Sequence, residues 1–263
     1  MRWRITTEAA LQDRLLDENL VDDLVAERRC PMSDHRPLNS SLSPLVFAGS
    51  YEDAIGVEEI TWHVKPLVHR TLPEEPSFEL STTIRGVEFR GCEIDGLEAE
   101  DHAVAASQGF REGDLGDLTY CVLSGDLPSF LDQGGTRVTA TIRFRLELQP
   151  RDPARPISLR LSVAISDQRY EVVDQMFEGG VLGLTKLLPH GTRLISCATC
   201  LFSDYSPSGQ GLLGMKCHRN AKQQYLAVRS KADYWQVPVT EQVMETHTCD
   251  EFQHRVPGTG YRG

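Results

Sequence analysis

TRVTATIRFRLELQ (residues 136–149) and ISLRLSVAI (residues 157–165) are the two stretches that decide the fold class. Apolar side chains occupy every second position in both, so each stretch has one apolar and one polar face. Such alternation predicts strands of an antiparallel sheet, with one face in a core and the other in water. PRDPARP between them reads as a surface loop, because proline cannot donate to a strand ladder.

Shorter stretches of the same character come earlier: ITWHV (60–64), FELSTTI (78–84) and VEFRGCEI (87–94). Residues 7–29 differ, because Leu recurs at every fourth position there and predicts a helix packed by one face. We therefore expect an α+β protein that is mainly antiparallel β, either sandwich-like or an open sheet. An N-terminal helix would pack against it, and a small four-cysteine metal-binding module would end the chain.

Charge divides the chain in the same way. The formal net charge is −11; residues 1–190 hold 19 basic and 32 acidic side chains, and residues 191–263 hold 8 and 6. We expect two domains: an acidic β-rich body with the helix (1–190) and a cysteine-rich metal-binding module (191–263). The excess negative charge argues against nucleic acid or an anionic membrane as a partner.

The expected location is the cytoplasm. No apolar run reaches the ~18 residues that a membrane-spanning helix needs, and the N-terminus MRWRITTEAALQDRLL is charged almost from its start, unlike a signal peptide. The 22 Arg against 5 Lys suggest a GC-rich, bacterial coding sequence.

The seven cysteines fall into two groups. Cys30, Cys92 and Cys121 are scattered through the body, and without an export signal we expect buried free thiols there rather than a disulfide framework. The other four, Cys197, Cys200, Cys217 and Cys249, follow the pattern C-x2-C-x16-C-x31-C. A C-x-x-C turn followed by a gap of 16 is typical of a zinc ribbon, although the last two cysteines come singly.

Three interpretations of this group are open: a metal site, a redox pair at 197/200, or inert buried thiols. A redox pair needs a helix directly after the motif, and LFSDYSPSG there is loop-like. We favour a metal site and zinc, with an iron–sulfur cluster as the alternative, since four thiolates suit both. His218 and His247 are substitute ligands. A closed site would be structural, and an open one with a bound water catalytic.

Residues near the cysteines suggest where a ligand or partner binds. Asp204 and Tyr205 begin the loop DYSPSGQGLLG (204–214), and the chain ends in the glycine-rich tail RVPGTGYRG (255–263). Residues 217–237 mix basic and aromatic side chains, which favours a strand pair over a single-stranded nucleic acid site. EGGVLGL (178–184) lacks the Rossmann spacing and is expected in a β or loop context.

The segments CATCLFSDYSPSGQG, MKCHR, DYW and PGTGYRG together resemble bacterial proteins grouped only as a family of unknown function. The resemblance covers the last third of the chain and implies neither an activity nor catalytic residues.

Two functions follow from these patterns. The first is a binding, adaptor or accessory protein whose metal orders a recognition surface for a protein or small-molecule ligand. The second is a metalloenzyme acting on a small substrate, with Asp204, Tyr205, His218 and His247 as candidate catalytic residues. The sequence alone leaves open whether the protein is an enzyme.

Overall fold

The computed structural model describes residues 36–37, 44–68, 76–149, 158–205 and 215–261. By internal contacts the chain divides into Met1–Ser33 and Asp34–Gly263, and the fold below is that of the second unit. The helix predicted at 7–29 and Cys30 lie outside the described residues.

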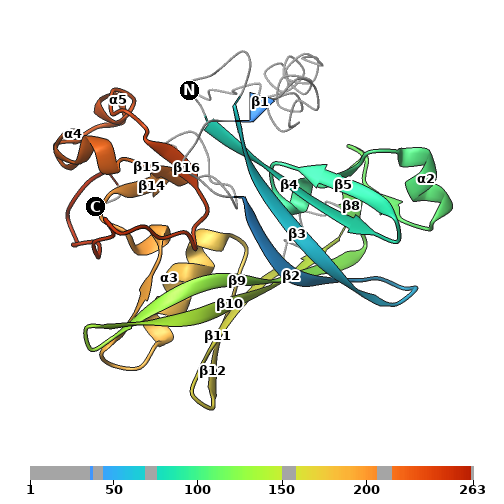
Figure 1. Cartoon of the computed structure of the whole chain (residues 1–263), viewed down its shortest axis with the longest axis horizontal. Coiled ribbons are helices and arrows are strands. Elements are labelled where there is room, and N and C mark those ends of the chain that lie inside the picture. Colours follow the sequence, from blue (N-terminus) through green and yellow to red (C-terminus); the bar gives the residue numbers. More distant parts are fainter. Residues whose placement is uncertain (1–35, 38–43, 69–75, 150–157, 206–214, 262–263) are drawn as a thin grey trace, which may run out of the picture. The chain divides into compact units, whose positions relative to one another are not determined.

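One large antiparallel sheet dominates the described part of the chain (Figure 1). Its strands follow the order β12-β11-β10-β9-β2-β3-β4-β5-β6, with β1 paired to β3 and β13 paired to β9. Their bounds are β1 Arg36–Pro37, β2 Leu45–Glu52, β3 Val57–Val68, β4 Pro76–Ile84, β5 Val87–Gly91, β6 Glu98–Ala99, β9 Cys121–Gln133, β10 Thr136–Leu148, β11 Ser158–Ile165, β12 Gln168–Asp174 and β13 Thr192–Ile195. β7 (Arg111–Glu112) and β8 (Leu118–Thr119) form a separate pair.

The prediction of a mainly antiparallel β protein is confirmed, and each quoted strand pattern overlaps a strand, although the stretch 87–94 is a strand only as far as Gly91. The patterns at 136–149 and 157–165 become β10 and β11, which pair with Phe144 opposite Leu161. Within the described residues, the path of paired strands runs from β12 to β6 without closing on itself.

The centre of the sheet is an aromatic cluster on its buried face. The Phe47 and Trp62 rings stack 6.1 Å apart, and Phe144 lies 6.4 Å from Phe47 and 6.1 Å from Trp62. Gly49 and Gly125 lie opposite each other on β2 and β9, where any side chain would collide with these rings. The glycines are therefore required by close packing.

The helices are short and lie on the sheet or between strands: α2 His102–Ser107, α3 Phe177–Leu187, α4 Lys222–Leu226 and α5 Lys231–Tyr234. Three 3-10 turns add to them: η1 Ile94–Gly96, η2 Cys197–Thr199 and η3 Arg219–Ala221. None of the helices in the described residues is long and apolar enough to cross a membrane.

Residues 178–184 lie in α3, so the expected β or loop context is wrong. Glycine has low helix propensity, but here it serves packing. A Cβ at Gly180 would lie 2.7 Å from Leu161 of β11, and one at Gly183 would lie 2.9 Å from Val172 of β12. Tertiary contact with the sheet therefore overrides local preference.

The C-terminal part carries a small sheet of β14 (Ser203–Tyr205), β15 (Met215–Cys217) and β16 (Glu241–Val243), with α4 and α5 beside it (Figure 1). Residues 219–234 hold η3, α4 and α5 rather than the expected strand pair. Cys197, Met215 and Val243 join the core of the large sheet, whereas a second cluster gathers around Tyr225 and Tyr234. The predicted domain boundary at residue 190 stays a prediction. Described residues from both sides of it, such as Phe144 and Met215, belong to the same hydrophobic core.

The body cysteines differ from one another. Cys121 on β9 is a buried free thiol, as expected, and burial raises its pKa to about 12. Cys92 forms a disulfide bond, so the expectation of a free thiol there is wrong.

Candidate metal centre

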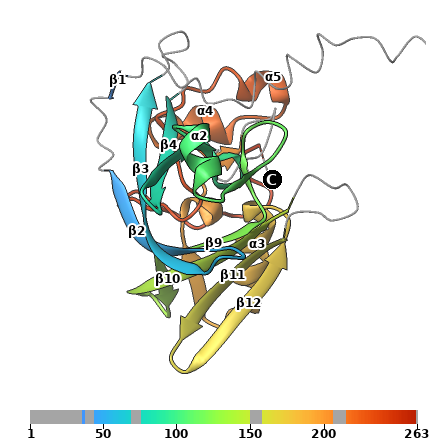
Figure 2. The ribbon, with the colours of Figure 1, turned by 90° about the vertical axis from the view of Figure 1, so that its right-hand side faces the viewer.

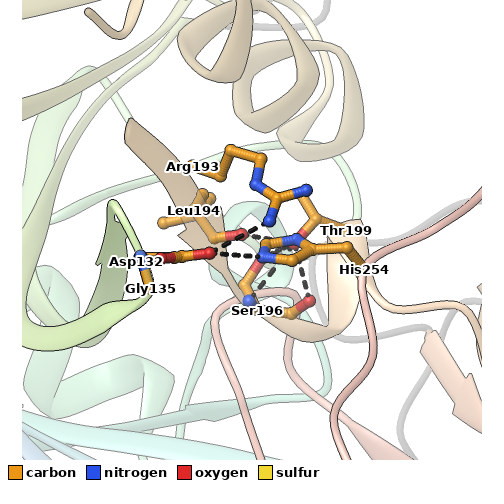
Figure 3. Close-up of polar contacts among 7 residues, drawn as sticks. All are labelled: Asp132, Gly135, Arg193, Leu194, Ser196, Thr199 and His254. Carbon is orange, nitrogen blue, oxygen red and sulfur yellow. Dashed lines mark hydrogen bonds and ion pairs between the residues drawn. The ribbon is translucent and has the colours of Figure 1, made fainter. Parts of the chain in front are cut away.

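The C-x-x-C motif sits on a turn that grows directly out of the large sheet. β13 pairs with β9, and the chain then tightens into η2. The backbone N–H of Ser196 donates to Thr199 Oγ1 at 3.3 Å, and that hydroxyl donates to the carbonyl of Leu194 at 2.8 Å (Figure 3). These bonds close the turn between the two cysteines of the motif, and Cys200 N–H bonds back to the Cys197 carbonyl at 3.1 Å.

Asp132, at the end of β9, ties the turn to the C-terminal segment (Figure 3). Its Oδ1 accepts the Gly135 N–H at 2.7 Å, and its Oδ2 lies 3.0 Å from Arg193 and 3.3 Å from His254 Nε2. The Gly135 N–H, followed by Arg193, lowers the pKa of this carboxyl. His254 also forms a β-bridge with Cys200. One carboxylate therefore holds both the strand before the motif and the segment that lies opposite its second cysteine.

Cys217 and Cys249 reach the same region from other segments. Ser203 pairs with Cys217 across β14 and β15, which brings the third cysteine beside the end of the motif. The loop after β16 runs along the turn: Cys197 N–H donates to the His247 carbonyl at 2.6 Å, two residues before Cys249. The sequence separations of 16 and 31 residues are thus closed by one small sheet and one loop.

The thiols are free and mostly buried. Cys197, Cys200 and Cys217 are buried, Cys249 is partly exposed, and none of the four is in a disulfide. Burial raises the pKa of Cys197 well above its ordinary value, and Cys200, Cys217 and Cys249 raise it further. Burial also raises the pKa of Cys217, with Cys249 and Cys200 adding to the effect. Each of these two thiols therefore senses the charge of its neighbours.

Donors approach two of the sulfur atoms. The Phe202 N–H lies 3.5 Å from Cys200 Sγ, and the Arg219 guanidinium lies 3.6 Å from Cys217 Sγ. Burial keeps the pKa of Cys217 above its ordinary value, although the Arg219 guanidinium lowers it. Within the described ranges, however, no three Cys, His, Asp or Glu side chains are arranged so that they could hold a metal ion.

His218, a substitute ligand and candidate catalytic residue, is fully buried. Its Nδ1 lies 3.0 Å from the Pro238 carbonyl, so Nδ1 carries the hydrogen, and its Nε2 accepts from Tyr234 O–H at 3.1 Å. The ring stacks on Tyr225 at 5.0 Å. Burial lowers the pKa of His218, which keeps it neutral. Both ring nitrogens are thus occupied within the fold.

Asp204 and Tyr205 are also buried, on β14. Tyr225 O–H donates to Asp204 Oδ2 at 2.8 Å, and Tyr205 O–H donates to Glu245 Oε1 at 3.1 Å. His247, the last candidate, is partly buried, and burial lowers its pKa. Three of the four catalytic candidates therefore belong to buried polar contacts, and 206–214, the remainder of the predicted loop, lies outside the described residues.

Several polar residues of this region were not predicted from the sequence. Glu245 is fully enclosed, and burial raises the pKa of its carboxyl well above the ordinary value. Arg255 donates to the Ser203 carbonyl and lies 3.4 Å from Tyr225 Oη. Asp132 and His254 form the tie described above. The partners of these residues lie far away in the sequence, so only the fold reveals them.

The sequence profile of a family of unknown function, DUF6304, matches residues 45–203, more than half of the chain. The chain belongs to this family. The expected resemblance to a family of unknown function is thus confirmed, but its expected place in the C-terminal third is not. No curated protein and no solved structure matches the sequence.

The DUF6304 match covers the large sheet from β2 onward and ends at the first residue of β14. It therefore includes Cys197 and Cys200 but stops before Cys217 and Cys249.

Proposed function

We propose that the protein is a binding or adaptor protein in which Cys197, Cys200, Cys217 and Cys249 bind one zinc ion that orders a recognition surface. The proposal is supported by the backbone contacts that bring together the three segments carrying these four free cysteines. Zinc in structural sites takes four thiolates in a tetrahedron.

The ion would have to draw the sulfur atoms together from their described positions, which do not form a ligand set. Two features favour this. The turn and its neighbouring strands are already fixed by backbone bonds, so little chain entropy remains to be lost. The Arg219 guanidinium beside Cys217 favours the thiolate of that residue, the form that zinc binds.

A structural role suits the size of this part of the protein. Cys197, Met215 and Val243 belong to the core of the large sheet, and among the described residues the separate apolar cluster around Tyr225 and Tyr234 holds eight buried residues. Such a small core contributes little free energy of folding, and small metal-binding modules gain most of theirs from the ion.

The recognition surface would combine the loop 204–214 with the C-terminal tail. Gly260 lies against the Tyr225 ring, so a side chain there would collide with it, and Tyr261 contacts Tyr234 at 5.0 Å. Trp235 also contacts Tyr234 and is 44% exposed, and Tyr261 is 37% exposed. Exposed Trp and Tyr on an ordered base are the residues that dominate protein interfaces.

The test is metal analysis of untagged, anaerobically purified protein. We expect one zinc ion per chain in the wild-type protein and about none in the Cys217→Ser or Cys249→Ser variant. Cys121→Ser is the matched control, because Cys121 is a buried free thiol outside the group. Cobalt substitution should give the visible bands of a tetrahedral thiolate site. Metal-free protein with all four thiols titratable would refute the site, and iron with sulfide would replace zinc by a cluster.

The second candidate function is a metalloenzyme acting on a small substrate, with His218 or His247 beside Asp204 and Tyr205. His247 favours it most, since its backbone contacts the cysteine turn and its side chain is only partly buried. An open site would change its cobalt spectrum when a small anion such as azide is added, and His247→Ala would alter that change. A closed four-thiolate site would show neither effect.

A further inference from the structure

In the part of the chain that the structure describes, the path of paired strands in the large sheet ends in two unpaired edges, and the edge of β12 is the longer one. Among the described residues β12 pairs only with β11, whereas the opposite end of the sheet is the two-residue strand β6. Figure 2 shows the β11–β12 hairpin at the margin of the sheet. Proteins usually protect such edges with Pro, charged side chains or a very short strand. QRYEVVD has seven residues and no Pro, and its edge carries charges of both signs, Arg169, Glu171 and Asp174.

The side chains of β12 alternate between two faces. Tyr170 and Val172 lie on the face covered by α3, where Val172 meets Gly183. Arg169, Glu171 and Val173 lie on the other face, and Val173 is 54% exposed. Within one chain Glu171 forms ion pairs with Arg160 and Arg169. The edge therefore presents one positive and one negative side chain, two residues apart, on its solvent face.

We propose that β12 pairs antiparallel with β12 of a second copy of this chain, about a two-fold axis at Tyr170. This register places Arg169 opposite Glu171 of the second copy, and Glu171 opposite the other Arg169. Opposite charges directly across an antiparallel pair are stabilising. The dimer would extend the sheet continuously across both chains.

Other registers lose this complementarity. Centring the axis on Arg169 or on Glu171 places two like charges opposite each other, and centring it on Val172 leaves both charges without a charged partner. A shift of the register by a single residue exchanges the two faces of one strand. The α3-covered face of one copy would then lie on the same side of the joined sheet as the solvent face of the other copy. Among the registers centred on residues 169 to 172, only the one centred on Tyr170 pairs opposite charges. A strand that pairs with itself forms a closed two-fold interface.

The test uses two single charge reversals, Arg169→Glu and Glu171→Arg, in the full chain. Either variant alone places like charges opposite each other at both positions, so the dissociation constant of its dimer should rise about tenfold or more. Mixed in equal amounts, the two variants become complementary at both positions, and dimer should return. Sedimentation velocity of each protein and of the mixture measures this.

Arg143→Glu is the control, since it makes the same charge change on the same sheet face but on β10, away from the edge. It should leave dimerisation unchanged, and circular dichroism checks that each variant is folded. A wild-type chain that stays monomeric at the highest attainable concentration overturns the proposal. A dimer that neither reversal weakens, or that mixing does not restore, overturns it as well.

Discussion

The large sheet and the C-terminal part of the chain are held together by different interactions. The sheet buries aromatic and aliphatic side chains from alternating strand positions, with Phe47, Trp62 and Phe144 at its centre. The C-terminal part buries thiols, a neutral histidine and the carboxyl groups of Asp204, Glu241 and Glu245. The first kind of core depends on apolar area, whereas the second depends on each polar group keeping its partner.

This difference implies different responses to perturbation. Loss of apolar volume weakens the sheet in proportion to the volume removed. Loss of one partner in a buried polar group leaves the other partner desolvated, so small chemical changes have large local effects. The predictions below test this contrast, from the largest expected effect to the smallest.

Removal of the proposed zinc should produce the largest difference between the stability of the C-terminal part and that of the large sheet. Chelation should raise amide hydrogen exchange by orders of magnitude in η2, β14 and β15, because structural zinc supplies much of the folding free energy of small modules. β10 and β11 should keep their protection, since their core is apolar. Hydrogen exchange measured by mass spectrometry with and without a chelator checks this. The same protection of η2, β14 and β15 in both samples would contradict the prediction.

Phe144→Ala should destabilise the sheet by about 3–5 kcal/mol, the usual cost of removing a buried aromatic ring. Phe144 is fully buried against Phe47 and Trp62, so the cavity cannot close easily. Chemical denaturation gives the free energy of unfolding. Arg143→Ala, one residue away on the solvent face, should cost about 1 kcal/mol or less. Similar losses for the two variants would show that the face assignment is wrong.

Much of the sheet could be predicted because strand alternation has a period of two that is visible in the sequence. Phe144 and Leu161 lie on the buried faces that their patterns predict. α3 was missed because Gly179, Gly180 and Gly183 obscure a helical pattern, and only their contacts with β11 and β12 explain them. Local preference cannot show a close approach between distant segments.

The candidate site was also predictable in part, because the spacing of its cysteines is visible in the sequence. The spacing of the cysteines pointed to one group, and the fold brings their segments together. The partners of Asp132 and Glu245 could not be foreseen, because His254 and Tyr205 are 122 and 40 residues away. The sequence also suggested a reactive role for His218, whereas burial and two hydrogen bonds occupy it.

Tyr225→Phe should cost about 1–3 kcal/mol, because it removes the hydroxyl that donates to the buried carboxylate of Asp204. The ring and its stacking on His218 stay, so packing is little changed. The melting temperature of the C-terminal part, followed by its aromatic circular dichroism, should fall. Tyr120→Phe is the control, since Tyr120 is 42% exposed and the loss of its hydroxyl should have little effect.

Glu245→Gln should change how stability depends on pH. Burial raises the pKa of Glu245 in the folded state above its unfolded value, so the folded chain holds a proton that the unfolded chain releases. The contribution of Glu245 to the free energy of unfolding is therefore fully present below the pKa of the unfolded state and is lost as pH rises through the pKa of the folded state. Between these two pKa values the free energy of unfolding falls by up to about 1.4 kcal/mol per pH unit. Glutamine cannot ionise, so the variant should lose this decline and be more stable than wild type at neutral pH. Denaturation from pH 4 to pH 8 measures it, with the surface variant Glu147→Gln as control; parallel curves for wild type and Glu245→Gln would mean that the carboxyl is ionised in the folded protein.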